Sequence, residues 1–261
     1  MRETIKIKLK EIEENYRVKI LYACESGSRA WGFPSKDSDY DVRFIYVHHP
    51  DDYLVIDPMG VGTKRDVIEL PINDMLDING WELTKALKLF RKGNPPLLEW
   101  MNSNIVYYHN YSTLKQMKGL IPEIFSPVSA IYHYLNMAKN NFRVYLQSDE
   151  VKIKKYFYVL RPVLASKWIE QYNEFPPLEF KALLERLIPE GDLKKEITTL
   201  YKRKIAGDEF DSEPRIQIIN DFLDTEIERL QNYAKSVKSK VENPTEKLNI
   251  IFKSTLQEVW R

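Results

Sequence analysis

The spacing of apolar residues divides the chain into two parts with different patterns. Over Ile5 to Tyr16 the apolar residues recur every three or four positions, which predicts an amphipathic helix. Val18 to Cys24 and Asp39 to Val47 are instead rich in consecutive apolar and β-branched residues, and each predicts a buried strand. The first part of the chain therefore mixes helical and extended patterns.

Shorter patterns follow between residues 53 and 93. Val67 to Ile72 and Met75 to Ile78 are each long enough for one short strand. Asn79 with Glu82 three residues later resembles a capping box, which predicts a helix that begins at Asn79. Gly93, which is followed closely by two prolines, is expected to end that helix.

Beyond about residue 120 the pattern becomes helical. Glycine is scarce there, and apolar residues recur at three- and four-residue spacing within long charged segments. These segments predict five helices: Ser129 to Leu146, Val151 to Gln171, Pro177 to Leu187, Leu193 to Lys204 and Arg215 to Lys240. The sequence therefore predicts an α/β (α+β) fold with two domains, an α/β domain over residues 1–120 and a helical domain over residues 121–261.

Composition narrows the class of protein. The 261 residues are 43% hydrophobic and 30% charged, which supports a packed core and excludes wholesale disorder. Lysine and arginine number 39 against 38 acidic residues, so bulk charge does not favour tight binding to a nucleic-acid duplex. The single cysteine, Cys24, excludes a disulfide framework and is expected in the core. The charged start and the lack of long apolar runs predict a soluble cytoplasmic protein with no membrane partner.

The residues with candidate chemistry lie in one stretch, SGSRAWGFPSKDSDYDV, from Ser26 to Val42. Residues two apart on a strand face the same side, so Asp39 and Asp41 are expected to project together. Adjacent carboxylates repel each other, and Mg²⁺ commonly binds one or two of them together with substrate phosphates. Gly27 and Ser28 end the first strand, and ten residues separate Ser28 from Asp39. Gly27 lacks a Cβ, so a phosphate can approach its backbone and meet the Ser28 hydroxyl.

An Asp-x-Asp pair alone is common on polar surface strands. Its position after a Gly-Ser turn that directly follows an apolar strand is what favours a site for Mg²⁺ and a triphosphate. This combination resembles the signature of the DNA polymerase β nucleotidyltransferase superfamily. More closely, ESGSRAWGFPSKDSDYDVRFIYV, LDINGWELTKALKLFRKGNPPLLEWMNS and YFYVLRPVLASKWI resemble the YcgL/RlaP family of predicted nucleotidyltransferases, over about residues 18 to 168.

The resemblance implies a mixed-sheet nucleotidyltransferase core, followed by helices. It also implies two Mg²⁺ ions, or Mn²⁺ in their place, held by three acidic residues. The implied reaction transfers a nucleoside monophosphate from an NTP such as ATP to an acceptor hydroxyl. The acceptor is left open among RNA, a protein and a small molecule, and an association with RNA repair is suggested for part of the family. The oligomeric state is left open as well.

The third acidic residue is less clear from the sequence than the first two. The resemblance favours Asp77, in Met-Leu-Asp-Ile, as the third catalytic and metal-binding carboxylate. Glu69, in Ile-Glu-Leu, is the alternative, whereas Asp66 and Asp74 have poorer apolar flanks. In the plain alternative, Asp77 is a helix-capping or loop acid without a catalytic role.

Several cationic or aromatic residues are weaker candidates for binding the nucleotide. Arg29 adjoins the Gly-Ser turn, and Lys85 lies about one helical turn after Gly80-Trp81; each is also consistent with a solvated surface. Lys154, Tyr158 and Arg161 share one side of a helix, where they would meet the triphosphate or the acceptor, or else belong to a plain amphipathic helix.

Two residue types are better explained by structure than by chemistry. Arg43 shares the face of Asp41 and is expected to pair with an acid there. The tryptophans Trp31, Trp81 and Trp100 are expected to pack rather than to stack on a base.

Two functions from different classes remain after the sequence analysis. The first is an Mg²⁺-dependent nucleotidyltransferase, in which Asp39, Asp41 and the third acid act on an NTP. The second is a nucleotide- or partner-binding module that keeps the pocket without transferring anything. A third acid distinguishes them, since its loss usually leaves binding without turnover; Asp77 and Glu69 are both available. Hydrolysis of the NTP by the same metals is a further possibility, which product analysis separates from transfer.

Overall fold

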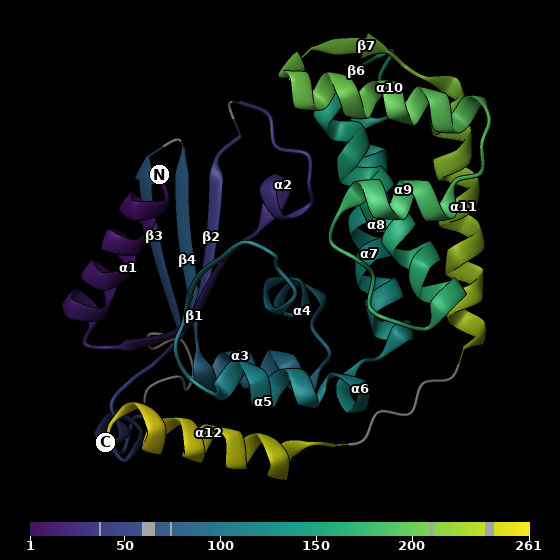
Figure 1. Ribbon diagram of the computed structural model, residues 1–261. Helices are drawn as coiled ribbons and strands as arrows, with labels where there is room; N and C mark the ends of the chain where they lie inside the picture. The colour runs from purple at the N-terminus through teal and green to yellow at the C-terminus, as the bar shows by residue number, and fades with distance from the viewer. Residues whose placement is uncertain (37, 59–65, 74, 209–210, 238–242) are drawn as a thin grey trace. The chain divides into compact units, whose positions relative to one another are not determined.

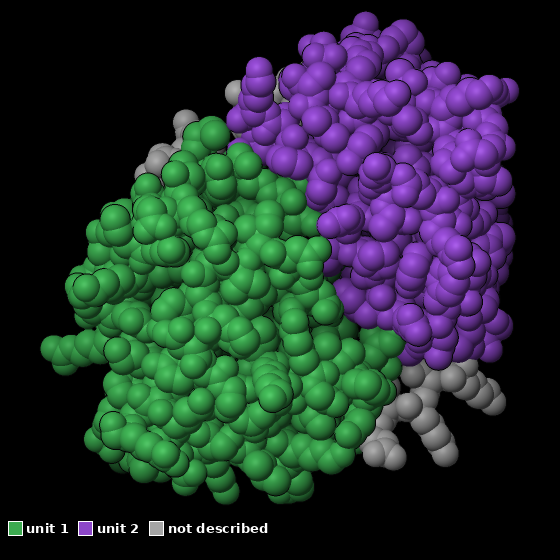
Figure 2. Space-filling model, viewed as in Figure 1, with its two compact units in different colours: residues 1–30, 39–125, 241–261 green, residues 31–38, 126–240 purple. Residues whose placement is uncertain are grey.

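The computed structural model describes residues 1–36, 38–58, 66–73, 75–208, 211–237 and 243–261. These residues form two compact units, which are coloured separately in Figure 2. Unit 1 comprises residues 1–30, 39–125 and 241–261, and unit 2 comprises residues 31–38 and 126–240. Each unit is described by itself.

Unit 1 is built on a mixed five-stranded sheet with the strand order β3-β4-β2-β1-β5 (Figure 1). Strands β2 and β4 are parallel, whereas the pairs β1–β2, β1–β5 and β3–β4 are antiparallel. Its elements in chain order are α1 (Arg2–Tyr16), β1 (Lys19–Glu25), α2 (Gly27–Ala30), β2 (Tyr40–Val47), η1 (Pro50–Tyr53), β3 (Val67–Asn73), β4 (Leu76–Glu82), α3 (Leu83–Arg91), α4 (Pro95–Met101), β5 (Val106–His109), α5 (Thr113–Gly119), α6 (Ile121–Ile124) and α12 (Thr245–Val259). The α/β fold class with a mixed sheet and a mostly helical C-terminal region is confirmed.

One face of the sheet is covered by α1, which buries Ile5, Leu9 and Ile12 against it. Alternate residues of β2 and β4 point to this face, among them Val42 and Phe44. The apolar face explains why the first helix and the first two strands follow the predicted pattern. It also fixes which residues of β2 point away from α1, namely Asp41 and Arg43.

The predicted helix start at Asn79 is wrong. Residues 79–82 belong to β4, and α3 begins at Leu83 with Glu82 as its N-cap, whose side chain accepts from the backbone N–H groups of Thr84 and Lys85. Gly80 is a strand residue rather than a turn residue, and a Cβ there would lie 2.2 Å from the ring of Phe44. The local capping signal is therefore satisfied by Glu82 alone, three residues later than expected.

The first described proline after α3 begins the next helix. Pro95 is at the first position of α4, where its fixed φ and missing N–H are tolerated. The sequence analysis assigned neither α4 nor the edge strand β5. It also missed α12, which packs against α3 and α5 of unit 1. Arg91 Nη1 donates to Thr245 Oγ1 at 2.9 Å, and Ser112 N donates to Glu258 Oε1 at 3.1 Å.

Unit 2 contains the five helices that the sequence predicts, with ends shifted by a few residues. The pairs α7–α8, α8–α9 and α7–α11 pack together, and α8 is buried along most of its length. Its elements are α7 (Pro127–Tyr145), β6 (Glu150–Lys152), α8 (Ile153–Tyr172), α9 (Phe180–Leu187), α10 (Asp192–Ala206), β7 (Ser212–Pro214) and α11 (Gln217–Ser236).

Residues 31–38 belong to unit 2, although the chain on both sides of them belongs to unit 1. The carbonyl of Trp31 accepts from Phe180 N at 2.9 Å, and the carbonyl of Gly32 accepts from Tyr201 Oη at 3.0 Å. The ring of Phe33 lies 5.1 Å from that of Phe157 and 5.8 Å from that of Phe180. The segment between the Gly-Ser turn and the Asp-x-Asp strand is therefore anchored among the helices of unit 2.

The compact units divide the chain differently from the predicted domains 1–120 and 121–261. Residues 121–125 and α12 cluster with the sheet, and residues 31–38 cluster with the helices. As a division into functional domains, the predicted boundary stays a prediction. Within the described residues, no helix combines the length and the apolar character needed to cross a membrane.

Candidate active site

Gly27 and Ser28, which were expected to end the first strand, are the first two residues of the short helix α2 that follows β1. Gly27 has φ +58°, a left-handed conformation in which a side chain is strained. A Cβ on Gly27 would lie 2.0 Å from Asp41 Oδ2. The glycine is therefore required by the close approach of the Asp41 carboxylate, a reason that the sequence did not reveal, in addition to any approach by a phosphate.

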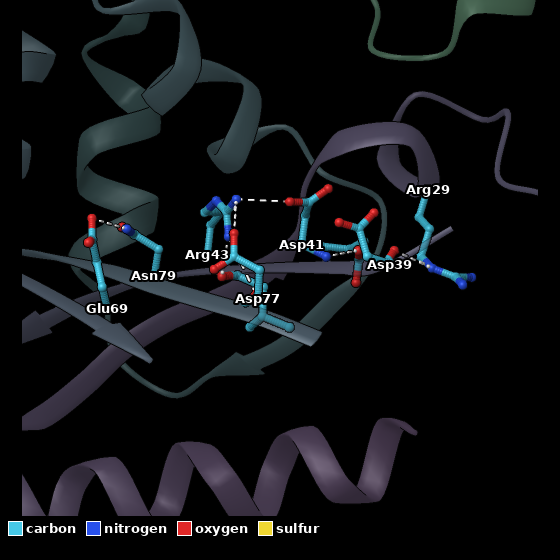
Figure 3. Close-up of polar contacts among 9 residues, drawn as sticks. Arg29, Asp39, Asp41, Arg43, Glu69, Asp77 and Asn79 are labelled. Atoms are coloured by element: carbon cyan, nitrogen blue, oxygen red, sulfur yellow. Dashed lines mark hydrogen bonds and ion pairs between the residues drawn. The ribbon is translucent and has the colours of Figure 1, made fainter. Parts of the chain in front are cut away.

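Three carboxylates rise from one side of the sheet, on the side opposite α1 (Figure 3). Asp41 on β2 and Asp77 on β4 are direct partners in the parallel register, so they lie on neighbouring strands at the same height. Asp39 precedes β2 by one residue and lies two positions from Asp41. The structure thus brings together Asp39, Asp41 and Asp77, the three residues that the sequence analysis favours.

Arg43 lies between two of these carboxylates. Its Nη2 donates to Asp41 Oδ1 at 2.9 Å and to Asp77 Oδ2 at 2.7 Å. The expected pairing of Arg43 with an acid is confirmed, and it involves two acids rather than one. The side chain of Asp77 is 50% exposed and that of Asp41 only 22%, so the pair opens toward solvent on the Asp77 side.

The environment of Asp41 disfavours its charge. Burial raises the pKa of this carboxyl, the Arg43 guanidinium lowers it, and the negative charges of Asp39 and Asp77 raise it again. The net direction is upward, as expected when carboxylates crowd together. A cation that bound beside Asp41 would relieve this repulsion.

A fourth acid, Glu25, supports the site from within the sheet. It is fully buried at the end of β1, and its Oε1 accepts from the backbone N–H of Asp41 at 2.8 Å. Its Oε2 accepts from the Tyr107 hydroxyl. Burial raises the pKa of Glu25, although these two hydrogen bonds lower it in part. Glu25 was not singled out from the sequence, although a lone charge directly after consecutive apolar residues was an available signal.

Glu69, the alternative third acid, lies farther along the sheet. It is on the edge strand β3, where it is the register partner of Asn79, and its Oε1 accepts from Asn79 Nδ2 at 2.8 Å. Figure 3 shows this pair on the far side of Arg43 from Asp39. The register therefore places Asp77, and not Glu69, beside Asp41. Asp74 lies outside the described residues.

Of the weaker candidates in unit 1, Arg29 lies near the acids and Lys85 does not. Arg29 Nε donates to the carbonyl oxygen of Asp39 at 3.0 Å, and its guanidinium lies 3.6 Å from the centre of the Tyr40 ring. Asp77 lies near the start of β4, whereas Lys85 follows the end of this strand. The five-residue step from Asp77 to Glu82 spans about 16 Å of extended strand. Its Nζ binds Asp66 Oδ2 at 3.0 Å.

The candidates on α8 belong to unit 2. Arg161 is buried there, with its guanidinium 4.4 Å from the centre of the Trp31 ring. Tyr158 is 37% exposed, and Lys154 is partly buried. Their predicted contact with the triphosphate or the acceptor stays a prediction. Trp31 packs within unit 2 as expected, and Trp81 packs against Trp100 with ring centres 3.9 Å apart.

The carboxylates of Asp41 and Asp77 are side chains of the kind that binds a divalent cation. Among the described residues, no group of three or more His, Cys, Asp or Glu side chains is arranged so that it could hold a metal ion. Asp41 and Asp77 nevertheless face each other closely enough to share one cationic group, Arg43. Their oxygens are the ligands that Mg²⁺ and Mn²⁺ prefer. Asp41 and Asp77 therefore offer oxygens of the kind that a divalent cation binds.

Gly27→Ala is expected to lower the free energy of unfolding by about 1–2 kcal/mol, because alanine is strained at a positive φ. The new methyl group also displaces the carboxylate of Asp41, so Mn²⁺ binding should weaken at least tenfold. Urea unfolding and Mn²⁺ titration measure the two effects.

Gly119→Ala is the matched control, because Gly119 ends α5 and has open space where a Cβ would be. This control should be neutral or more stable by up to about 1 kcal/mol. Unchanged Mn²⁺ affinity in a folded Gly27→Ala variant would contradict the tight packing of Gly27 against Asp41.

The chain is similar to a known protein family, to a known protein and to a solved structure. A family model described as RlaP, RNA repair pathway DNA polymerase beta family, matches residues 1–254. The chain is 53% identical over 261 residues to the protein YcgL of Bacillus subtilis (strain 168), covering 100% of this chain and 98% of that protein. A crystal structure of a nucleotidyltransferase-like protein from Exiguobacterium sibiricum 255-15 aligns over 97% of this chain and 79% of its own, with 10% identity and a TM-score of 0.30.

Proposed function

Because the chain belongs to the RlaP family, the RNA repair pathway DNA polymerase beta family, we propose that it is an Mg²⁺-dependent nucleotidyltransferase. In this proposal it transfers a nucleoside monophosphate from an NTP to an acceptor hydroxyl. The observation that carries the proposal is the register of β2 and β4, which sets Asp77 beside Asp41 on the face that also carries Asp39. The family description favours the 3′ hydroxyl of an RNA as the acceptor.

The reaction forms one bond and breaks another at the α-phosphorus. The acceptor oxygen bonds to this phosphorus, the bond to the bridging oxygen of the β-phosphate breaks, and pyrophosphate leaves. Two bound Mg²⁺ ions would supply charge stabilisation to the attacking and the leaving oxygens. Asp39 and Asp41 would hold the ions, and Asp77 would complete the site and accept the proton of the acceptor hydroxyl.

The turn after β1 would position the triphosphate. Gly27 lies next to Asp41 and is followed by Ser28, and Arg29 adds a positive charge beside Asp39. Most of the rate acceleration would come from positioning and from charge stabilisation. Lys154, Tyr158 and Arg161 remain candidates for contacting the triphosphate or the acceptor.

The test is incubation of the protein with each α-labelled NTP, Mg²⁺ and separate fractions of cellular RNA, protein and metabolites. We expect label on one fraction and one pyrophosphate released per label incorporated. Labelled nucleoside monophosphate without a labelled acceptor would indicate hydrolysis. Binding of the NTP without any product would indicate the non-catalytic module.

A further inference from the structure

A single nitrogen of Arg43, Nη2, contacts both Asp41 and Asp77. Its Nη2 is 2.9 Å from Asp41 Oδ1 and 2.7 Å from Asp77 Oδ2, and its Nη1 is 3.0 Å from the carbonyl oxygen of Val42. Figure 3 shows the guanidinium between the two carboxylates, with Asp39 on the other side of Asp41. One cationic group thus bridges two of the three acids.

The position of Arg43 follows from the sheet. It lies two residues after Asp41 on β2, so both side chains point to the same face, and the parallel register sets Asp77 beside Asp41. The Arg43 side chain is only 18% exposed. Sheltered charge-assisted hydrogen bonds of this length are stronger than those between neutral groups or on an open surface.

Arg43 engages one oxygen of Asp41 and one oxygen of Asp77, so a metal ion held by these two carboxylates would share them with a positive guanidinium. Repulsion between the two cations favours release of at least one carboxylate by Arg43 when the ion arrives. Release without a new partner leaves a largely sheltered positive charge unpaired next to a divalent cation, which is unfavourable. A triphosphate removes this difficulty, because guanidinium groups bind phosphate oxygens well.

We propose that Arg43 exchanges partners when substrate binds, holding Asp41 and Asp77 together before the metal arrives and binding the triphosphate afterwards. This inference rests on the proposed metal site of the nucleotidyltransferase. In the free protein Arg43 competes with the metal, and in the loaded protein it binds the nucleotide. The residue therefore opposes metal alone and favours metal together with NTP.

The proposal predicts effects of opposite sign for Arg43→Gln. Mn²⁺ alone, measured by the electron paramagnetic resonance of the free ion, should bind at least tenfold tighter than to the unaltered protein. A non-hydrolysable ATP analogue, titrated calorimetrically at saturating Mg²⁺, should bind at least fivefold more weakly. A variant that is merely better or worse folded would shift both affinities in one direction.

Lys6→Gln is the matched control, because it removes the same charge from α1, where Lys6 Nζ pairs with Glu3 at 2.9 Å. Both affinities of this control should stay within twofold of the unaltered protein. A second measurement is made on the unaltered protein. The ¹⁵N resonances of its Arg43 guanidinium should change when Mg²⁺ and the analogue are added. Arg43→Lys assigns these resonances by their loss.

Three results would overturn the proposal. The first is an Mn²⁺ affinity of Arg43→Gln that is unchanged or reduced, and the second is an affinity for the ATP analogue that is not reduced in this variant. The third is a set of guanidinium resonances that do not change when Mg²⁺ and the analogue are added. If the unaltered protein transfers nucleotides and one of these results is found, only the role of Arg43 is wrong. If the unaltered protein neither binds Mn²⁺ nor transfers a nucleotide, the proposed function is wrong, and the proposed role of Arg43 is wrong as well.

Discussion

Asp41→Asn is expected to lower the rate of nucleotidyl transfer at least a hundredfold, and Asp39→Asn should do the same. A hundredfold loss corresponds to about 2.7 kcal/mol of lost transition-state stabilisation. The reason is that both carboxylates stand on the face where Asp77 joins them, so each would hold a cation that stabilises the reacting oxygens.

The two variants should stay folded. Asn at position 41 loses the ion pair with Arg43, but it also removes a partly buried charge whose pKa is raised by burial and by neighbouring acids. We therefore expect the free energy of unfolding, measured with urea, to change by only about 1 kcal/mol. Asp52→Asn, in the short helix η1, is the control for an Asp-to-Asn change and should transfer normally. Near-normal transfer by either site variant would mean that the metal assignment is wrong.

Asp77→Asn is expected to abolish transfer while Mg²⁺ and NTP still bind through Asp39 and Asp41. Glu69→Gln should be close to the unaltered protein. Asp77 is the register partner of Asp41, whereas Glu69 is the partner of Asn79 on the edge strand and is hydrogen-bonded to it. Transfer is measured with labelled NTP, and binding is measured calorimetrically with a non-hydrolysable analogue.

The pair of variants separates three assignments of the third acid. If Glu69→Gln is inactive and Asp77→Asn is active, the role belongs to Glu69. If both variants transfer, a mechanism with three carboxylates is wrong. If Asp77→Asn loses nucleotide binding as well as transfer, Asp77 contributes to the ground-state complex and not only to the reaction.

The elements that were predicted correctly are those whose pattern is local. α1, β1, β2 and the helices of unit 2 bury apolar residues at regular spacing, and this spacing is visible in the chain itself. The helix start at Asn79 was wrong because a capping box is a local signal too. Residues 79–82 instead pair with residues 43–46 of β2, and this pairing with a distant strand is not visible in the local sequence.

The candidate site was predicted in part for the same reason. Asp39 and Asp41 lie close in sequence, so their shared face follows from the period of a strand. The position of Asp77 depends on a parallel pairing between residues 36 positions apart, which spacing alone does not reveal; resemblance to a family favoured it instead. Glu25 was missed because its partners, the Asp41 N–H and the Tyr107 hydroxyl, come from two other strands.

The anchoring of residues 31–38 among the helices has a consequence for synthesis on the ribosome. Trp31 and Phe33 leave the ribosome early, but their partners Phe157 and Phe180 are made more than a hundred residues later. α12, which packs against α3 and α5, follows later still. The sheet unit therefore cannot reach its final packing until α12 has been made, and a chain stopped at residue 125 would expose Trp31 and Phe33 and lack α12. Such a fragment is expected to aggregate rather than to fold as an independent catalytic domain.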